Sequence, residues 1–357
     1  MRTIQISSSK TQYPVYIGDG AVARLTPLLR ARGKTRVFII TSPKIWAPWQ
    51  RQLRHAIQSQ AHVFMVQPGE KHKNLNTIQT LAEQLARGGA ARDALLIAFG
   101  GGVIGDITGF LAATYMRGID YLQIPTTLLA QVDSSVGGKT GVNLKAGKNL
   151  VGSFNPPRAV FADTQFLQTL PVRELRAGLY ESIKAGILGD KKLFATLERF
   201  RPEILARDAH ALSEITTASV RVKAKIVMQD EHERGVRMTL NLGHTLGHAI
   251  EAATRYRQLL HGEAVAWGLR LAAGIAQARG VLSQENATRI DNLILAYGPP
   301  PDFSASDSRI VRLTYGDKKN DTRGRRFILP TAIGKTIVAT DVTDEEMLTA
   351  MKQLRTR

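Results

Sequence analysis

The 357-residue sequence contains no cysteine, and this absence excludes two kinds of structure. Disulfide bridges cannot form, and a metal site built on thiolates cannot form either. Any bound metal ion must therefore be held by His, Asp or Glu side chains. Histidine is itself scarce, with 8 residues in the chain, so a group of histidines stands out.

Long apolar segments are also missing. Residues 94–114 form the most apolar stretch, but it is interrupted by Gly100, Gly101, Gly102, Gly105, Asp106 and Gly109. Because a membrane-spanning helix needs about 20 mostly apolar residues, we expect a buried strand, a glycine turn and a packed helix here. The first 18 residues alternate polar and apolar, unlike a secretory signal. We therefore expect a cytoplasmic protein without membrane association.

Acidic residues are few relative to basic ones, and the formal net charge is +18. Such a charge suits either the attraction of anionic substrates or the binding of nucleic acid. A nucleic-acid surface would favour cationic runs with interleaved aromatics, whereas aromatic residues make up 6% of the chain and the Lys and Arg residues are dispersed. The sequence favours a small anionic substrate.

The chain is too long for one ordinary core, and its periodicity changes along its length. Apolar runs predict strands at residues 36–41, 61–66, 94–99 and 121–124, and helical spacing occupies residues 74–88. After Pro171, helical spacing dominates in residues 174–188, 192–200, 212–230, 240–254 and 263–279. We predict a Rossmann-like α/β domain with a parallel sheet over residues 1–165 and an all-α domain over residues 166–357.

A glycine motif follows the predicted strand at residues 94–99. Gly100 to Gly105 fits G-x-G-x-x-G and opens a predicted helix, as a dinucleotide site requires. A glycine-rich turn without a ligand fits the same residues. Asp120 lies where a simple interpretation puts the ribose-binding acid, but at least two βα units precede this turn. We therefore expect the ribose nearer Thr41 or Glu70.

Two histidines are four residues apart in a predicted helix. His244 and His248 share one helical face, which extends to Arg237, Asn241 and Glu251. Gly243 and Gly247 predict that a backbone or a ligand approaches this helix closely, because each glycine costs about 1 kcal/mol in a helix interior.

Other candidate ligands lie on neighbouring helices. His261 opens the next predicted helix, and Glu181 and Lys184 share a face of an earlier one. A carboxylate and two or three imidazoles can bind zinc, although hydrogen-bonded histidines without a metal fit the pattern too.

Taken together, these segments resemble the 3-dehydroquinate synthase family. The similarity lies in residues 69–73, 101–106, 115–118, 125–140, 147–149, 181–184, 241–251, 261–263 and 317–320. The block at 126–140 and the paired Gly-His segments are the most specific parts.

The resemblance implies roles for individual residues. The metal ligands would be Glu181, His244 and His261. The NAD contacts would be Glu70, Lys73, Gly102, Val103, Ile104, Gly105, Asp106, Thr126, Thr127, Lys139, Lys148, Phe166, Leu167, Gln168 and Thr169. Residues acting on the substrate would be Arg117, Asp133, Lys139, Lys148, Asn149, Lys184, Lys223, Arg237, Asn241, His248 and one of Lys318 or Lys319.

The resemblance also implies an activity. Enzymes of this family convert 3-deoxy-D-arabino-heptulosonate 7-phosphate to 3-dehydroquinate by transient oxidation with NAD, phosphate elimination, re-reduction and an aldol closure. The expected cofactors are NAD and zinc or cobalt, and the expected assembly is a homodimer. Related sugar phosphate cyclases and metal-dependent alcohol dehydrogenases, which share the fold, are the alternatives.

Overall fold

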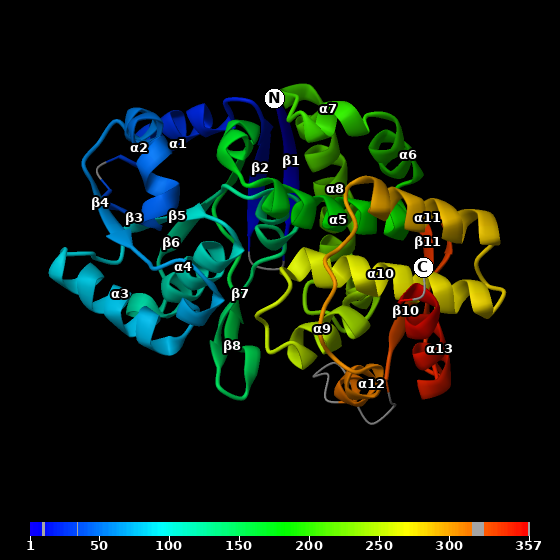
Figure 1. The fold of residues 1–357 in the computed structure, drawn as a ribbon. Coiled ribbons are helices and arrows are strands. Elements are labelled where there is room, and N and C mark those ends of the chain that lie inside the picture. Colours follow the sequence, from blue (N-terminus) through cyan, green and yellow to red (C-terminus); the bar gives the residue numbers. More distant parts are fainter. Residues whose placement is uncertain (9–10, 34, 316–324, 356–357) are drawn as a thin grey trace. The chain divides into compact units, whose positions relative to one another are not determined.

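The computed structural model describes residues 1–8, 11–33, 35–315 and 325–355, which divide into two compact units (Figure 1). The first unit comprises Met1–Leu170 and Arg207–His232, and the second comprises Pro171–Ala206 and Glu233–Arg357. None of the described helices has both the length and the apolarity needed to cross a membrane.

The first unit is built on a seven-stranded sheet with the order β1-β2-β9-β6-β5-β3-β4. Its strands are β1 (Arg2–Ser7), β2 (Gln12–Gly18), β3 (Val37–Thr41), β4 (Ala61–Met65), β5 (Leu95–Gly100), β6 (Asp120–Pro125) and β9 (Val160–Asp163). Only β1 and β2 pair in antiparallel fashion, while the other neighbouring strands of this sheet are parallel. The predicted parallel sheet is confirmed, and the alternating N-terminal segment forms two paired strands.

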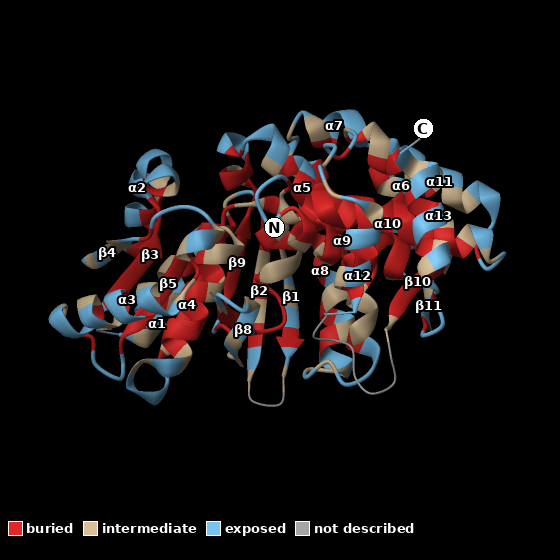
Figure 2. Ribbon diagram, turned by 60° about the horizontal axis from the view of Figure 1, so that its bottom comes forward, coloured by how far each residue is buried: buried red, intermediate tan, exposed pale blue. Residues whose placement is uncertain are grey.

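The central strands are buried on both faces, which explains their continuous apolar sequence. Phe38 and Leu96 contribute to one core cluster, which includes side chains of α3 and α4. Val37 and Leu95 contribute to another, which includes side chains of α1 and α2. Successive residues of β3 and β5 thus supply opposite layers, and both strands are buried throughout (Figure 2).

Helices and a second sheet complete the first unit. The helical elements are η1 (Ala21–Arg24), α1 (Leu25–Arg32), α2 (Pro43–Ile57), η2 (Glu70–His72), α3 (Leu75–Arg87), α4 (Gly102–Thr114), η3 (Tyr115–Arg117), the π-helix η4 (Ala130–Ser134), η5 (Thr164–Thr169) and α8 (Ala209–Gln229). A two-stranded antiparallel sheet pairs β7 (Lys139–Leu144) with β8 (Gly147–Phe154).

Helix α8 belongs to the first unit, although the predicted division at residue 165 assigns its residues to the helical domain. Val220 and Ala224 of α8 share an apolar cluster with Val15 and Val160 of the sheet. Helical periodicity reveals that a helix has an apolar face, but it does not reveal which surface that face covers.

The second unit is mainly helical. Its helical elements are α5 (Val172–Gly189), α6 (Lys191–Arg199), α7 (Arg201–Leu205), η6 (Val236–Asn241), α9 (His244–Ala253), α10 (His261–Ala278), α11 (Gln284–Ala296), α12 (Asp307–Thr314) and α13 (Asp344–Arg355). It also contains a hairpin of β10 (Phe327–Ala332) and β11 (Lys335–Ala339), which the sequence interpretation did not predict.

Helices α9 and α10 approach closely through glycine, as Gly243 and Gly247 predicted. A Cβ atom on Gly247 would lie 3.0 Å from the carbonyl oxygen of Ala264, and one on Gly268 would lie 1.8 Å from that of Gly243. The approaching group is therefore the backbone of a neighbouring segment in the same unit. This close packing brings the beginning of α10 next to α9.

Candidate functional site

The glycine turn has the predicted context, because β5 ends at Gly100 and α4 begins at Gly102. Free backbone N–H groups at such a helix start can bind a phosphate. A Cβ on Gly101 would lie 3.0 Å from the Thr127 side chain, and one on Gly102 would lie 2.9 Å from Ser134 Oγ. A side chain at either position would therefore crowd Thr127 or Ser134 even without a ligand, and the packing places Thr127 against the turn.

Asp120, in contrast, lies at the start of β6, opposite Leu95 at the start of β5. The glycine turn follows the carboxyl end of β5, so Asp120 lies at the opposite end of these two strands. Its carboxylate is bound by Arg32 Nη2 at 2.6 Å and by Arg158 Nε at 2.7 Å. This position agrees with our expectation that Asp120 does not bind the ribose.

Three predicted site residues of the first unit meet around a buried ammonium group. Lys73, which is 4% exposed, donates to Asn149 Oδ1 at 2.6 Å and pairs with the Asp106 carboxylate. Burial raises the pKa of Asp106, and the charge of Lys73 opposes that rise. The ion pair holds the second turn of α4 to the segment after η2.

Asn143 connects this cluster to Glu70, and the sequence interpretation missed it. Its Nδ2 donates to Glu70 Oε1 at 2.8 Å, and its Oδ1 accepts the Asn149 N–H at 2.9 Å. Its own N–H donates to the carbonyl oxygen of Lys73 at 2.8 Å. A hairpin prediction over residues 139–154 would have brought Asn143 near Asn149, because Leu144 pairs with Gly147.

A second contact joins η4 to α8. Lys223 Nζ lies 2.7 Å from Asp133 Oδ1 and 2.6 Å from the backbone oxygen of Asp133. Arg117 is exposed at the end of η3, and it forms no ion pair with any residue that the structure describes.

The remaining predicted residues of the first unit have varied surroundings. Thr126 is buried, Lys139 is exposed at the start of β7, and Lys148 is half-buried in β8. Phe166 and Leu167 are buried, and the Phe166 ring packs edge-on against Trp49 and Phe99 with centroids 5.0 and 5.2 Å away. Gln168 and Thr169 are exposed, so they are better placed to contact a ligand. Lys318 and Lys319 lie outside the described residues.

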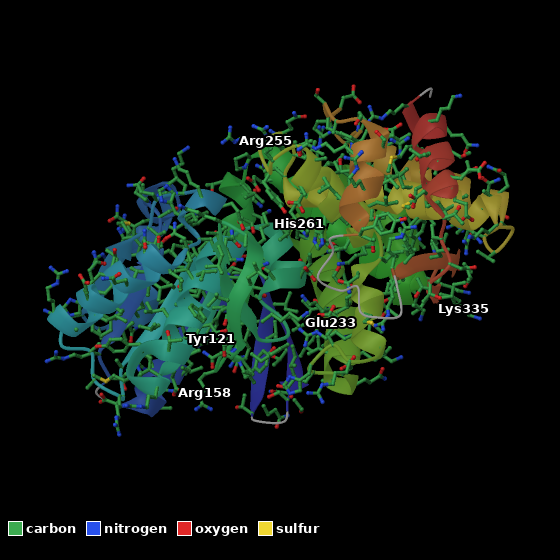
Figure 3. All side chains as sticks on the ribbon, turned by 90° about the horizontal axis from the view of Figure 1, so that it is seen from below. Tyr121, Arg158, Glu233, Arg255, His261 and Lys335 are labelled. Carbon is green, nitrogen blue, oxygen red and sulfur yellow. The ribbon has the colours of Figure 1, made fainter. Side chains whose placement is uncertain are left out.

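Three helices of the second unit bring a carboxylate and imidazoles together. Glu181 lies on α5, His244 begins α9 and His261 begins α10, where Figure 3 labels it. Glu181 Oε1 is 3.7 Å from His244 Nε2 and 3.5 Å from His261 Nε2. Two ligands of a tetrahedral zinc ion, each bound at about 2.0–2.1 Å, lie about 3.3–3.4 Å apart. Glu181 Oε1 therefore lies at nearly the separation from each of these two nitrogens that a shared ion would impose.

The Glu181 carboxylate is deeply buried beside a cation. Glu181 is 2% exposed and Lys184 is 3% exposed, with Lys184 Nζ 2.5 Å from Glu181 Oε2. Burial raises the pKa of Glu181, but Lys184 and His261 outweigh it and hold the pKa well below its ordinary value. Oε1 accepts no hydrogen bond of normal geometry from the described residues. A charged buried oxygen without such a bond suits a metal ligand.

The rings of His244 and His261 are each held by a contact at Nδ1, the nitrogen that does not face Glu181. His244 Nδ1 is 3.1 Å from the backbone oxygen of Leu242, and His261 Nδ1 is 3.1 Å from Glu251 Oε2. These contacts favour a proton on each Nδ1 and leave each Nε2 to bind an ion.

His248 joins the same group of rings. One nitrogen from each of His244, His248 and His261 lies within 4.8 Å of the others. Two triads of donors therefore share His244 and His261, one completed by Glu181 and the other by His248. We favour Glu181 as the third ligand, because it lies 3.7 and 3.5 Å from the two shared histidines and its low pKa keeps it negatively charged.

Arg237 and Asn241 do not share the helical face of the histidines, and that part of the prediction is wrong. They lie in η6, and Gly243 separates η6 from α9 with a φ of 76°. Asn241 Nδ2 donates to Glu233 Oε1 at 2.8 Å, and Arg237 is 2% exposed. The predicted helix from residue 240 failed because a left-handed glycine ends one segment and begins another.

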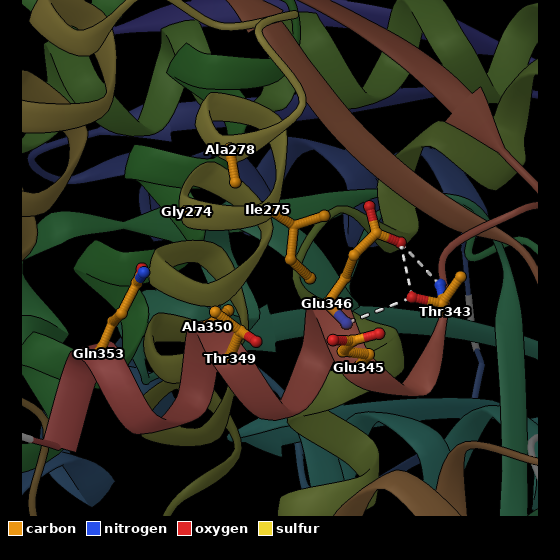
Figure 4. Close-up of a pocket in the computed structure, with 9 residues that line it drawn as sticks. All are labelled: Gly274, Ile275, Ala278, Thr343, Glu345, Glu346, Thr349, Ala350 and Gln353. Carbon is orange, nitrogen blue, oxygen red and sulfur yellow. Dashed lines mark hydrogen bonds between the residues drawn. The ribbon is translucent and has the colours of Figure 1, made fainter.

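A groove of about 230 Å³ lies between α10 and α13 (Figure 4). Gly274 in its lining is thirteen residues beyond His261 on the same helix. That spacing corresponds to about 20 Å along the helix axis, so the groove is not part of the metal cluster.

Comparisons with known proteins agree with these features. A family model described as 3-dehydroquinate synthase N-terminal matches residues 63–177, and one described as 3-dehydroquinate synthase C-terminal matches residues 178–320. The 3-dehydroquinate synthase of Koribacter versatilis is 43% identical over 99% of this chain and 98% of its own. That of Pseudoalteromonas translucida is 43% identical over 99% of this chain and 100% of its own.

Solved structures of other synthases share the fold along nearly the whole chain. The 2-epi-5-epi-valiolone synthase of Streptomyces hygroscopicus, with NAD⁺ and Zn²⁺ bound, has a TM-score of 0.90 and 27% identity, covering 98% of this chain and 99% of its own. A 2-deoxy-scyllo-inosose synthase with carbaglucose-6-phosphate, NAD⁺ and Co²⁺ has a TM-score of 0.88 and 26% identity, covering 99% of this chain and 100% of its own.

A unit built on a parallel sheet and a helical unit in which a carboxylate contacts two histidines define the class of dehydroquinate synthase-like proteins. Within this class, the chain belongs to the 3-dehydroquinate synthase family.

Proposed function

We propose that this chain converts 3-deoxy-D-arabino-heptulosonate 7-phosphate to 3-dehydroquinate and inorganic phosphate, with NAD and a zinc or cobalt ion as cofactors. The observation that carries the proposal is the convergence of Glu181, His244 and His261 in a chain of this family. We assign these three residues as the metal ligands. Relatives of the fold that bind NAD⁺ with Zn²⁺ or Co²⁺ support this choice of cofactors.

In this proposal each of the two units binds one of the two cofactors. In the first unit, residues 1–170 with α8, we assign Glu70, Lys73, Thr126, Thr127, Lys139, Lys148, residues 102–106 and residues 166–169 to NAD. The second unit holds the metal ion. When bound, NAD accepts a hydride and later returns it, and the ion supplies Lewis-acid chemistry.

The substrate's charge explains the cationic residues. It carries a carboxylate and a phosphate, so its binding needs Arg and Lys groups that make charge-assisted hydrogen bonds. The residues that we assign to substrate binding in the first unit are Arg117, Asp133, Lys139, Lys148, Asn149 and Lys223. Those of the second unit are Lys184, Arg237 and Asn241.

Proton movement falls to His248 in this proposal. Its ring centroid lies 5.3 Å from that of His244 and 5.7 Å from that of His261, so it lies next to the metal ligands. An imidazole can gain or lose a proton near neutral pH, which suits a group that exchanges protons with the substrate's hydroxyls.

We also propose a cytoplasmic homodimer. The assembly is supported by the family resemblance, and the location by the biosynthetic role of the named relatives. Sedimentation of the purified chain tests the assembly, and a single species of about 39 kDa would contradict the dimer.

The activity is tested with purified protein, the heptulosonate phosphate, zinc and a substoichiometric amount of NAD. Phosphate release that exceeds the NAD supplied, without net accumulation of NADH, supports the proposal. Net NADH without phosphate release would indicate an alcohol dehydrogenase. Turnover of glucose 6-phosphate in preference to the heptulosonate would indicate another sugar phosphate cyclase. Glu181→Gln serves as the inactive control.

A further inference from the structure

Glu251 has no role in the function proposed above, yet this acidic residue is 3% exposed and next to a proposed metal ligand. It lies in the last turn of α9, and His261 begins α10. A buried carboxylate is expensive to desolvate unless it is paired, and an acid at this position therefore calls for a specific explanation.

We propose that Glu251 is a positioning residue for the metal site, and that it fixes the ring orientation and tautomer of His261 so that Nε2 binds the ion. This inference rests on the proposed function, because it assumes that Glu181, His244 and His261 hold a divalent metal.

The geometry separates Glu251 from the ion itself. Glu251 Oε2 is 3.1 Å from His261 Nδ1, whereas Glu181 Oε1 is 3.5 Å from His261 Nε2. The two nitrogens lie on different edges of the imidazole ring. An ion between His261 Nε2 and Glu181 is therefore not reached by the Glu251 oxygen that accepts from Nδ1. Glu251 acts on the ion through the ring.

The two histidine ligands differ in how they are held. The acceptor for His244 Nδ1 is the backbone oxygen of Leu242, which no substitution removes. The acceptor for His261 Nδ1 is the Glu251 side chain, which a substitution can remove. A carboxylate acceptor also makes the imidazole a stronger donor to the metal than a neutral carbonyl does. A substitution at Glu251 can thus change the hydrogen bond of His261 while that of His244 stays the same.

A purely structural ion pair between α9 and α10 is the competing explanation. The two helices already pack through Gly243 against Leu269 and through Gly247 against Ala264. Their apolar neighbours Leu246, Ala249 and Ile250 are all buried. The contact between α9 and α10 therefore does not depend on the Glu251–His261 pair. An apolar residue at position 251 should preserve this contact. Buried ion pairs are often replaced by apolar residues without loss of stability.

The test compares zinc affinity in full-length variants by competition with a chromogenic chelator. Glu251→Leu removes the acceptor, and we expect zinc to bind roughly 10- to 100-fold more weakly. Glu251→Gln keeps an oxygen acceptor without the charge, and its loss should be smaller. Glu346→Gln, which alters a remote carboxylate of the same unit, should bind zinc like the parent. Thermal unfolding of the metal-free variants shows whether the fold is intact.

Cobalt supplies a second readout that a structural role would not change. With Co²⁺ in place of zinc, Glu251→Leu should shift the visible ligand-field bands, because the donor strength of His261 changes. Zinc affinity and cobalt bands that equal the parent's in a folded Glu251→Leu protein would overturn the inference while the proposed function stands. A parent that binds neither metal would overturn both the metal assignment and the role of Glu251.

Discussion

At the scale of single residues, the proposed chemistry depends on a few charged side chains that are buried. Lys184 and Glu181 form an ion pair on one face of α5, with both residues almost fully buried. Their spacing of three residues predicted the shared helical face but not the ion pair. In our proposal Glu181 binds the metal ion and Lys184 binds the anionic substrate, so the two roles can be separated by mutation.

Lys184→Ala should retain zinc but have a lower kcat/KM. Removal of a charge-assisted hydrogen bond worth about 1.5–3 kcal/mol should lower kcat/KM roughly 10- to 100-fold. The measurements are steady-state kinetics and the zinc content of the dialysed protein. Lys184→Arg, which keeps the charge, should recover part of the loss. Unchanged kinetics in Lys184→Ala would exclude the role in substrate binding.

Asn143→Leu should weaken NAD binding. The substitution removes the hydrogen bonds to Glu70 and to the Asn149 N–H, each worth about 1 kcal/mol, so the dissociation constant should rise roughly tenfold or more. Titration of NAD followed by protein fluorescence measures it. Asn76→Leu, at an exposed position of the same unit, is the control. Equal NAD affinities in the two variants would show that Asn143 does not position the cofactor residues.

Helices and strands position these side chains, and two glycines of α10 allow a direct comparison of close and open packing. A Cβ on Gly268 would lie 1.8 Å from the Gly243 carbonyl oxygen, whereas one on Gly274 would meet nothing within 4 Å. Gly268→Ala should therefore force α9 away and lower the free energy of unfolding by about 1–3 kcal/mol or more.

Gly274→Ala should have the opposite effect. Alanine is favoured over glycine in a helix by up to about 1 kcal/mol, and this position has space for it. Chemical denaturation of both variants measures the difference. Zinc binding should fall in Gly268→Ala and stay unchanged in Gly274→Ala. Equal stabilities would contradict the close packing of α9 on α10.

The N-terminus of α13 gives the second unit a pH-dependent contribution to stability. Glu346 accepts a hydrogen bond from the Thr343 N–H at 2.8 Å, and Thr343 Oγ1 accepts one from the Glu346 N–H at 3.2 Å (Figure 4). Arg279 Nε is 2.5 Å from Glu346 Oε1. The hydrogen bond from Arg279, together with smaller contributions from those of Thr343, outweighs burial and lowers the pKa of Glu346 from 4.5 to about 2.

Because this pKa is depressed by folding, the stabilisation is complete above pH 4.5 and is lost as the pH falls toward 2. The side chain is 29% exposed, so we expect a contribution on the order of 1 kcal/mol after solvent screening. Unfolding of the parent and of Glu346→Gln should therefore differ at neutral pH and converge as the solution becomes acidic. A difference that is constant with pH would contradict this assignment.

At the scale of the whole chain, the sequence predicted many of the strands and helices, because these elements leave a local periodicity of apolar residues. The strands near residues 37, 95 and 120 and the helices of the second unit follow from apolar runs and helical spacing. The glycines at 243 and 247 correctly predicted a close approach of backbone. These features follow from neighbouring residues and need no knowledge of tertiary contacts.

Features that depend on distant contacts were not predictable in this way. The membership of α8 in the first unit depends on which surface covers its apolar face, and the role of Asn143 depends on the register of the β7–β8 hairpin. The break at Gly243 depends on a left-handed backbone that helical spacing does not reveal. The metal ligands and cofactor residues were reached through family resemblance, because residues on separate helices carry no mutual spacing signal.

The central claim is that one ion is held by a carboxylate from α5 and two imidazoles from α9 and α10. Crystals grown with zinc and NAD, measured at the zinc absorption edge, test it most directly. We predict one anomalous peak within about 2.2 Å of Glu181 Oε1 and of the Nε2 atoms of His244 and His261. A peak that is coordinated by His248 while Glu181 stays out of bonding distance, or no peak at this cluster, would contradict the claim.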